Sequence, residues 1–524
     1  MNTLTRRNTF IGGLWAVASV VFPLVSTLLL SIVIARRLGS EQLGEQSVIA
    51  YVGSSVAGVV VFAATSCAMQ VMAAARGRGD SGRLAALRRL SHRVHVLGGF
   101  IAGVGIASFG TFREQPLAWL LIGLVTFIDA VGWSHGGSLI AQHGWRAVSP
   151  LRLLSQIVAA LLGVLAILLG GGIVWVFAAQ VLTSTWLTMT LRRRDGRTQL
   201  TDDTAPSPLA LQPLGRLWLL FILSMLLSQI VDKRMELLFL DAFGSAHQVA
   251  VYAVAFSLVT VAVTVPSSLA AAAIPGIAAA GAADVTGALT AHLRRATRLA
   301  SVAAFLLTAG LAALGPSMVV LFWGAPLQDA AEILPWMAIS VLFVPIRVLY
   351  DAYWTGVGRL APVLLSSGAG ALVDIAVAAV LVPHLGIAGA VAANVAAQVV
   401  VCGLVVAYTR RHVTGMQASG GQLVRSAAIS VVAGAAGWLG AAAAAGAGPL
   451  CALLAGAAAF AVVVVAVGLV VGLVPPADAD WLVDTLPAVA RPALVVVGGL
   501  GWARSRPSEQ PGADPVPATS ADRA

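Results

Sequence analysis

The stretch GRLAPVLLSSGAGALVDIAVAAVLVPHLGIAGAVAANVAAQVV, residues 358–400, contains two long apolar runs separated by a short segment around Pro383 and Gly386. A helix that crosses a bilayer needs about 20 consecutive apolar residues. Each run reaches about that length, and Asp374 is the one acidic residue in them. The stretch therefore predicts two transmembrane helices joined by a tight turn.

The composition of the whole chain agrees with this prediction. Its 524 residues are 59% hydrophobic and 10% charged, and the mean hydropathy is +0.91. Soluble domains are about half apolar and about a quarter charged. The short alternating segments of transmembrane strands do not occur here. The fold class predicted is therefore an all-α polytopic membrane protein.

Fourteen apolar windows are long enough to be membrane spans. They cover residues 10–34, 46–73, 94–111, 116–140, 151–169, 172–191, 216–241, 248–279, 299–322, 332–354, 361–382, 386–408, 425–446 and 449–474. An even number of spans places both termini on one side, and basic residues concentrate in the segments of that side. This asymmetry predicts that both termini lie in the cytoplasm; outside the spans, the exceptions are Arg36, Arg37 and Arg113. Arginine far outnumbers lysine, and Ala, Gly and Val are abundant, which indicates a GC-rich bacterial genome and so a bacterial cytoplasmic membrane. The net charge of +10 then reflects topology and contact with anionic membrane lipids, rather than binding of nucleic acid.

A long polar segment divides the spans into six and eight, which indicates two lobes. The predicted parts are an N-terminal lobe at 1–191, a cytoplasmic linker at 192–215, a C-terminal lobe at 216–408, two further spans within 409–474, and an interfacial segment with a disordered cytoplasmic tail at 475–524. Residues 481–502 fit either an interfacial helix or a fifteenth span.

Catalytic and metal-binding patterns do not stand out. Cys67, Cys402 and Cys451 lie scattered in apolar windows, which supports neither a disulfide framework nor a metal site. His92 and His95 fall in what reads as an arginine-rich loop without further ligands. We therefore expect no enzyme, no cofactor and no metal centre.

The two predicted lobes begin with similar segments. LGSEQLGEQSVIAYV at residues 38–52 aligns with FGSAHQVAVYAVAFS at residues 243–257, matching the Gly-Ser pairs that start at Gly39 and Gly244. In both segments one span ends, a short turn follows, and a long span returns. Repeated halves with a substrate site between them are common in transporters.

Three hairpins resemble those of a known family. They are ARRLGSEQLGEQSVIAYVGSSVAGVVVFAATSCAMQV at 35–71, FLDAFGSAHQVAVYAVAFSLVTVAVTVPSSLAAAAIPGIAA at 239–279, and the LVPHLGIAGAVAA core at 381–393. The chain resembles, over about residues 5–475, the bacterial lipid-linked oligosaccharide flippases, a Wzx-like polysaccharide-transporter branch of the multidrug/oligosaccharidyl-lipid/polysaccharide (MOP) exporter superfamily. The resemblance implies two pseudo-symmetric six-helix lobes, two trailing helices, a central cavity and alternating access. Where Asp374 stands, that family often has Asn.

Charges inside the seventh span suggest a binding site. The segment SQIVDKRMELL, residues 228–238, places four polar residues on one face if the span is one helix: Gln229, Asp232, Lys233 and Glu236. Intramembrane charges are costly and usually functional. We expect this stripe to line the outer half of the cavity, with Lys233 facing anionic substrate groups. The alternative is a Lys233–Glu236 pair at a helix interface.

A second site lies in the tenth span, in PIRVLYDAYW at residues 345–354. The guanidinium of Arg347 suits diphosphate oxygens; the alternative is an internal pair with Asp351 one turn away. Taken with Lys233, this would place one deep cation on each side of the membrane midplane.

Other charged residues are candidates for coupling or substrate contact. Asp129 and Asp374 each stand alone in apolar surroundings, where a carboxylic acid can exchange a proton or bind a cation; with Asp351 they are the coupling candidates. Otherwise they are hydrogen-bonded or paired with a buried cation. Arg36 and Arg37 fit either interfacial anchoring or contact with the departing substrate.

The resulting prediction is a flippase that moves a polyprenyl-diphosphate-linked oligosaccharide to the outer leaflet for cell-surface polysaccharide synthesis. A proton or Na⁺ gradient, or the membrane potential, would drive it, and a polysaccharide polymerase or assembly proteins would be its partners. The alternatives are a cation-coupled multidrug or metabolite exporter of the same architecture and a scaffold for envelope assembly that transports nothing.

Overall fold

The computed structural model describes residues 22–199, 211–282, 286–413, 420–485 and 498–499. Within these ranges, 13 helical segments are long and apolar enough to cross a membrane. They match the second to fourteenth predicted spans, and the helix over residues 22–38 matches the described part of the first. The chain is thus an all-α multi-pass membrane protein. The tail predicted to be disordered, residues 503–524, lies outside the described residues.

The N-terminal lobe consists of the helix over residues 22–38 and five further spans. Their helices are α2 (Ser40–Ala57), α3 (Ala63–Gly77), α4 (Ser81–Gly110), α5 (Pro116–His143), α6 (Ser149–Leu168) and α7 (Ile173–Gln199). A π-helical turn, Gly58–Phe62, connects α2 to α3 within one span. The helix α4 begins well before the predicted span, so His92 and His95 lie on a helix and the predicted loop is wrong.

The C-terminal lobe contains two interrupted spans. Its helices are α8 (Leu211–Val231), α9 (Glu236–Phe243), α10 (Ala246–Ala282), α11 (Thr286–Phe322), α12 (Gln328–Met337), α13 (Val344–Gly356), α14 (Ala361–Leu385) and α15 (Ile387–His412). The seventh span breaks between α8 and α9, and the tenth breaks at the 3-10 segment Ala338–Leu342 between α12 and α13. Pro335 and Pro345 flank this second break. Pro335, inside α12, removes one helical hydrogen bond, and Pro345 lies in the first turn of α13, where a proline is tolerated because the N–H there has no partner within the helix.

The trailing helices α16 (Gly420–Ala443) and α17 (Pro449–Val471) pack against α11. The short helix α18 (Pro476–Thr485) follows them at one end of the molecule, and Asp478 anchors it through ion pairs with Arg295 and Arg298 of α11.

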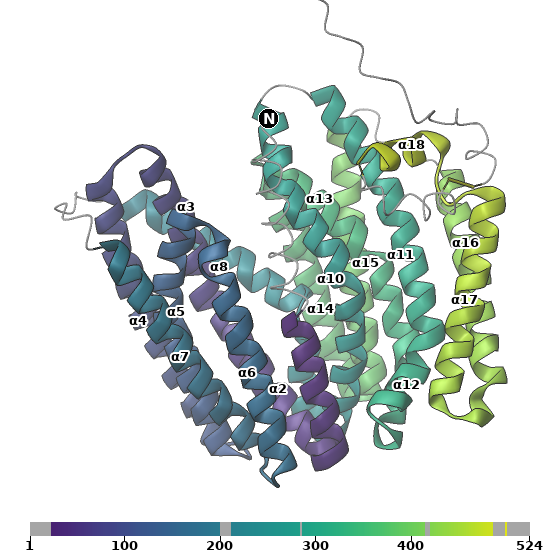
Figure 1. The fold of residues 1–524 in the computed structure, drawn as a ribbon, viewed down its shortest axis with the longest axis horizontal. Helices are drawn as coiled ribbons and strands as arrows, with labels where there is room; N and C mark the ends of the chain where they lie inside the picture. The colour runs from purple at the N-terminus through teal and green to yellow at the C-terminus, as the bar shows by residue number, and fades with distance from the viewer. Residues whose placement is uncertain (1–21, 200–210, 283–285, 414–419, 486–497, 500–524) are drawn as a thin grey trace, which may run out of the picture.

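The two lobes meet at one end and diverge toward the end that carries α18 (Figure 1). Where they meet, the repeated segments pack against each other, since α2 contacts α10 closely. A side chain at Gly44 would collide with the carbonyl of Ala246, so glycine is required for this approach. In addition, Arg36 donates hydrogen bonds of 2.6 Å to the carbonyls of Leu321 and Phe322 at the end of α11.

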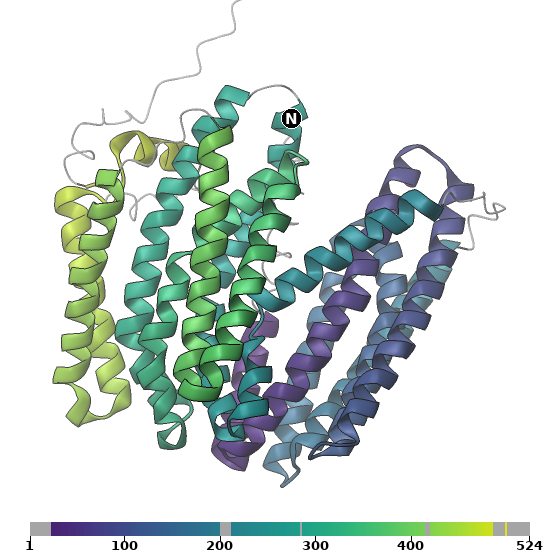
Figure 2. The same cartoon turned by 180° about the vertical axis from the view of Figure 1, so that it is seen from behind.

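The helix α8 runs obliquely from one lobe to the other (Figure 2). Near its start, Leu214 packs into a cluster around Met72 of α3. At its end, Val231 packs with Ala371 of α14 and Val401 of α15. The sequence assigned this segment to the C-terminal lobe, whereas the structure places its first turns against the N-terminal lobe.

Candidate functional site

The charged segment of the seventh span lies in a break, not in a continuous helix. Residues 232–235 form a turn between α8 and α9, and Arg234 has a φ of 31°, in the left-handed region that few residues other than glycine adopt. The predicted polar stripe assumed 100° of rotation for each residue through this segment. That geometry is wrong, because the turn changes the direction in which the four side chains project.

A distant helix stabilises the break. The carbonyl of Val231, the last residue of α8, has lost its helical partner, and the amide Nε2 of Gln398 on α15 donates to it at 2.9 Å. A buried carbonyl without a partner costs about 1–3 kcal/mol. This hydrogen bond connects α15 to the broken span.

The two predicted cationic sites are in fact one. Arg347 of α13 forms an ion pair with Asp232 in the break and a second one, at 3.6 Å, with Asp351 on its own helix. Arg347 is only 5% exposed. The expected separation of the cations across the midplane is therefore wrong, and the alternative pairing of Arg347 with Asp351 is present. The guanidinium holds the two broken spans together.

The other residues of the predicted stripe point to different surroundings. Gln229 lies against the N-terminal lobe, where its amide fills the space beside Gly58. Lys233 is exposed and forms no ion pair among the described residues. Arg234 lies over the ring of Phe256 on α10, with 5.8 Å between its guanidinium carbon and the ring centroid. Of the cations in this segment, only Lys233 is open to an approaching ligand.

Glu236 belongs to a second, fully enclosed cluster. It lies close to Asp374 of α14, Tyr252 of α10 and Asn394 of α15, and each of the four is at most 3% exposed. None of the carboxyl oxygens of Glu236 or Asp374 makes a hydrogen bond of normal geometry within the described residues. The predicted isolation of Asp374 is therefore wrong, because another carboxyl group lies beside it.

This acid pair has the composition of a site for one positive charge. Two buried carboxylates repel each other, so that they require a shared proton or a cation. Carboxyl, amide and phenol oxygens are hard donors of the kind that alkali and alkaline-earth cations bind. Glu236 and Asn394 could be assigned to this site only through the fold.

The remaining candidates lie elsewhere. Asp129, on α5, is not alone either, since it lies near Ser184 of α7 and interacts with the charge of Arg152. Arg36 binds the carboxyl end of α11, where a cation complements the helix dipole, and Arg37 is exposed at the same end. Arg36 is thus a contact between the lobes.

One polar network was missed by the sequence analysis. The carboxylate of Asp195 on α7 accepts hydrogen bonds from Arg88 of α4 at 3.1 Å and from Ser138 of α5 at 2.9 Å. Its other oxygen lies 2.9 Å from Nδ1 of His135. Asp195 stood in the segment predicted to be a linker, so its burial was not expected. The network connects three helices of the N-terminal lobe.

No family model and no curated protein matches this sequence. Solved structures do match the fold. A multidrug resistance MATE family transporter of the MOP superfamily, in an inward-facing conformation, superposes with a TM-score of 0.61 and 16% identity, over 77% of this chain and 99% of that one. The lipid II flippase MurJ, in an inward closed conformation, superposes with a TM-score of 0.62 and 13% identity, over 86% of this chain and 97% of that one.

A third match is a MOP superfamily transporter from Pyrococcus furiosus, described as having a binding pocket of reversed polarity. It has a TM-score of 0.56 and 16% identity, over 78% of this chain and 96% of that one. These structural neighbours are transporters, not enzymes. With its two lobes, its trailing helices and this similarity over most of its length, the chain has the fold of the MOP superfamily transporters.

Proposed function

We propose that this chain is a flippase that carries a polyprenyl-diphosphate-linked oligosaccharide across the bacterial cytoplasmic membrane by alternating access. Both termini lie in the cytoplasm in this proposal, so the lobes diverge on the cytoplasmic side. The substrate enters there and leaves at the end where the lobes now meet. The glycan is then used for cell-surface polysaccharide.

The observation that carries the proposal is that Lys233, at the break between α8 and α9, is an exposed residue. A lysine binds phosphate oxygens as a compact point charge. Its two charged neighbours, Asp232 and Arg234, are engaged by Arg347 and by the ring of Phe256. Lys233 is therefore left with a charge that an anionic diphosphate would neutralise. The similarity to a lipid II flippase supports the same substrate class.

The acid pair of Glu236 and Asp374 supports coupling to a cation. In this proposal a proton or Na⁺ occupies the pair, and the pair is directly connected to the substrate position, because Glu236 begins α9 immediately after the break. Occupation of the pair would favour one arrangement of the broken span over the other. Asp129 is the second coupling candidate, in the other lobe.

A cation-coupled exporter of drugs or metabolites is the second candidate function. The buried acid pair and the similarity to a multidrug transporter favour it. A cationic drug would be repelled by Lys233, whereas an anionic lipid would be attracted. The charge at position 233 thus distinguishes the two candidates.

Lipid mass spectrometry tests the proposal. A strain that lacks the gene would be compared with strains complemented by the wild-type chain, by Lys233→Ala and by Lys233→Arg, each at equal protein level in the membrane. We expect a polyprenyl-diphosphate oligosaccharide to accumulate in the deletion and with Lys233→Ala, and to fall again with Lys233→Arg. If no such lipid accumulates in the deletion, the exporter replaces the flippase.

A further inference from the structure

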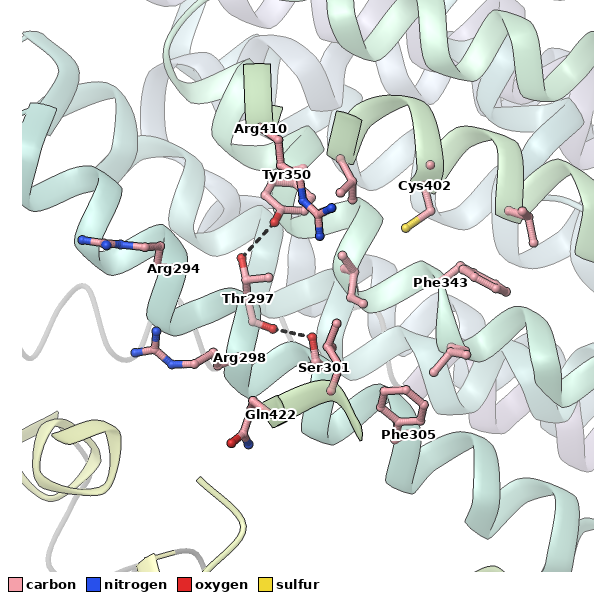
Figure 3. A pocket seen from close by; sticks show the side chains of 16 residues that line it. Arg294, Thr297, Arg298, Ser301, Phe305, Phe343, Tyr350, Cys402, Arg410 and Gln422 are labelled. Carbon is pink, nitrogen blue, oxygen red and sulfur yellow. Dashed lines mark hydrogen bonds between the residues drawn. The ribbon is translucent and has the colours of Figure 1, made fainter. Parts of the chain in front are cut away.

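A separate cavity of about 380 Å³ lies between the C-terminal lobe and the trailing helix α16, at the end that carries α18 (Figure 3). Its wall is formed by α11, α13, α15, α16 and the 3-10 segment before α13. This volume falls within the usual range of small-ligand sites, about 300–1,000 Å³. The cavity does not include the break at 232–235 or the acid pair.

The cavity changes from cationic to apolar along its length, and α11 shows this change most clearly. Arg294, Arg298, Ser301 and Phe305 all line it. Their spacing of four, three and four residues places them on one face of the helix. Arg294 lies near the start of the span, and Phe305 lies eleven residues, or about 16 Å, deeper.

The wall formed by α15 changes from cationic to apolar in the same direction. On α15, Arg410 lies two residues from the end of the helix, and Val406, Cys402 and Val399 follow on the same face toward the membrane interior. Arg410 and Val399 are also eleven residues apart. Two helices from different parts of the chain therefore place arginine at the same end of the cavity and apolar side chains at the other, as Figure 3 shows.

The charge at the cationic end is only partly neutralised. Asp478 of α18 binds Arg298 through both carboxylate oxygens, at 2.6 Å each. Arg294 and Arg410 are exposed, and neither has an acidic partner among the described residues. Among the residues that the structure describes, no acidic side chain lines the cavity. Two guanidinium groups are thus available to one anion.

We propose that this cavity binds an anionic phospholipid of the adjoining leaflet. The phosphate contacts Arg294 and Arg410, one acyl chain lies along Phe305 and Val406, and the second chain stays in the bilayer. Guanidinium groups bind phosphate oxygens in a planar, bidentate manner. Basic pockets between transmembrane helices are suited to anionic lipid headgroups. The occupant is a resident lipid, distinct from the transported one, and the site does not depend on the proposed function.

Native mass spectrometry of the full-length purified chain tests the headgroup contact. The probe is phosphatidylglycerol, with phosphatidylcholine of the same acyl chains and inorganic phosphate in parallel samples. At about 1 kcal/mol for each arginine, the double variant Arg294→Gln/Arg410→Gln should bind phosphatidylglycerol about 30-fold less tightly. The matched control, Arg76→Gln/Arg78→Gln, removes two exposed arginines from the same end of the other lobe and should leave binding unchanged.

A second variant tests the acyl-chain part without changing charge. Gly403 lines the cavity on α15, and a Cβ atom there would meet open space. The substitution Gly403→Leu therefore fills the cavity and should reduce binding of phosphatidylglycerol at least tenfold, with the melting temperature retained.

Several outcomes would overturn the proposal. If phosphatidylcholine bound as tightly as phosphatidylglycerol, the negative charge would have no role in recognition. If Gly403→Leu bound phosphatidylglycerol as tightly as the wild-type chain, the lipid would lie on the surface and not in the cavity. If inorganic phosphate bound as tightly as the lipid, the acyl chain would contribute nothing to binding. Displacement of the bound lipid by polyprenyl diphosphate at stoichiometric concentration would make the cavity part of the transport path.

Discussion

The Nη1 atom of Arg113, between α4 and α5, lies 2.6 Å from Oδ2 of Asp241 on α9, so an ion pair joins the two lobes at the end where they meet. Nearby, Nδ1 of His247 on α10 lies 3.0 Å from the hydroxyl of Ser40 on α2. With the hydrogen bonds from Arg36 to the end of α11, these contacts close one end of the molecule. In the proposed mechanism, they must break before substrate can leave.

We predict that Asp241→Asn shifts the lobes toward separation at this end. The side chains of Arg113 and Asp241 are 37% and 22% exposed. Ion pairs with this much exposure stabilise the contact they form by about 0.2–1 kcal/mol. This free energy changes a population ratio by up to about fivefold. Distances between spin labels on the two lobes would measure the shift. The exchanged variant Arg113→Asp/Asp241→Arg should restore the original distribution; if it does not, the pair has no gating role.

Arg347 is predicted to stabilise the fold, in addition to pairing with Asp232 and Asp351 at the break. Replacing it by methionine leaves the carboxylates of Asp232 and Asp351 close together without a cation. Removing one partner of a buried pair costs about 3–5 kcal/mol, and we expect the lower end because Asp232 is 29% exposed. Thermal unfolding in detergent would show a lower melting temperature.

The control for this variant is Arg359→Met, which removes an exposed arginine shortly after α13. It should change the melting temperature little. Neutralising all three groups, with Arg347→Met/Asp232→Asn/Asp351→Asn, should recover much of the loss. Equal stability of Arg347→Met and Arg359→Met would contradict the structural role of the ion pair.

The acid pair is predicted to carry the dependence of transport on a cation. Either Glu236→Gln or Asp374→Asn removes one of two buried carboxylates, so the requirement for a shared positive charge disappears. Transport in proteoliposomes should then lose its dependence on the proton or Na⁺ gradient, while the chain stays folded. Asp129→Asn, in the N-terminal lobe, is the matched variant. Loss of the dependence in Asp129→Asn alone would place coupling in the other lobe.

Gly44 is predicted to limit how closely the lobes approach. A side chain there meets the backbone of Ala246, which cannot move without shifting α10. Overpacking of this kind costs about 1–3 kcal/mol. We expect Gly44→Val to lower the melting temperature and to lengthen the distances between lobes. Gly105→Val, at a helical glycine with open space around it, should do neither.

Much of this architecture follows from hydropathy. Because a bilayer requires about 20 apolar residues per span, the windows locate the helices well, and the repeated Gly-Ser turns after Leu38 and Phe243 mark equivalent hairpins. The start of α4 was misplaced, because its first turns are polar and extend beyond the apolar window.

The break in the seventh span could not be predicted in the same way. The segment around Asp232 contains neither glycine nor proline, and its flanks read as one apolar helix. What holds the break is Gln398 on α15 and Arg347 on α13, more than a hundred residues away. The acid pair depends on the same long-range arrangement, since Glu236 and Asp374 are brought together only by the packing of α9 against α14.

The oblique helix α8 also has a mechanical consequence. Its 21 residues make a rod about 32 Å long, with its first turns fixed to one lobe and its last residue fixed to the other. If the lobes rotate relative to each other, this rod has to swing about the turn at residues 232–235, and a swing of 10° would move its far end by about 5.5 Å. Lys233 lies in this turn, so an anion bound there would act at the pivot itself, where a small change in backbone direction becomes a large displacement at the far end of α8.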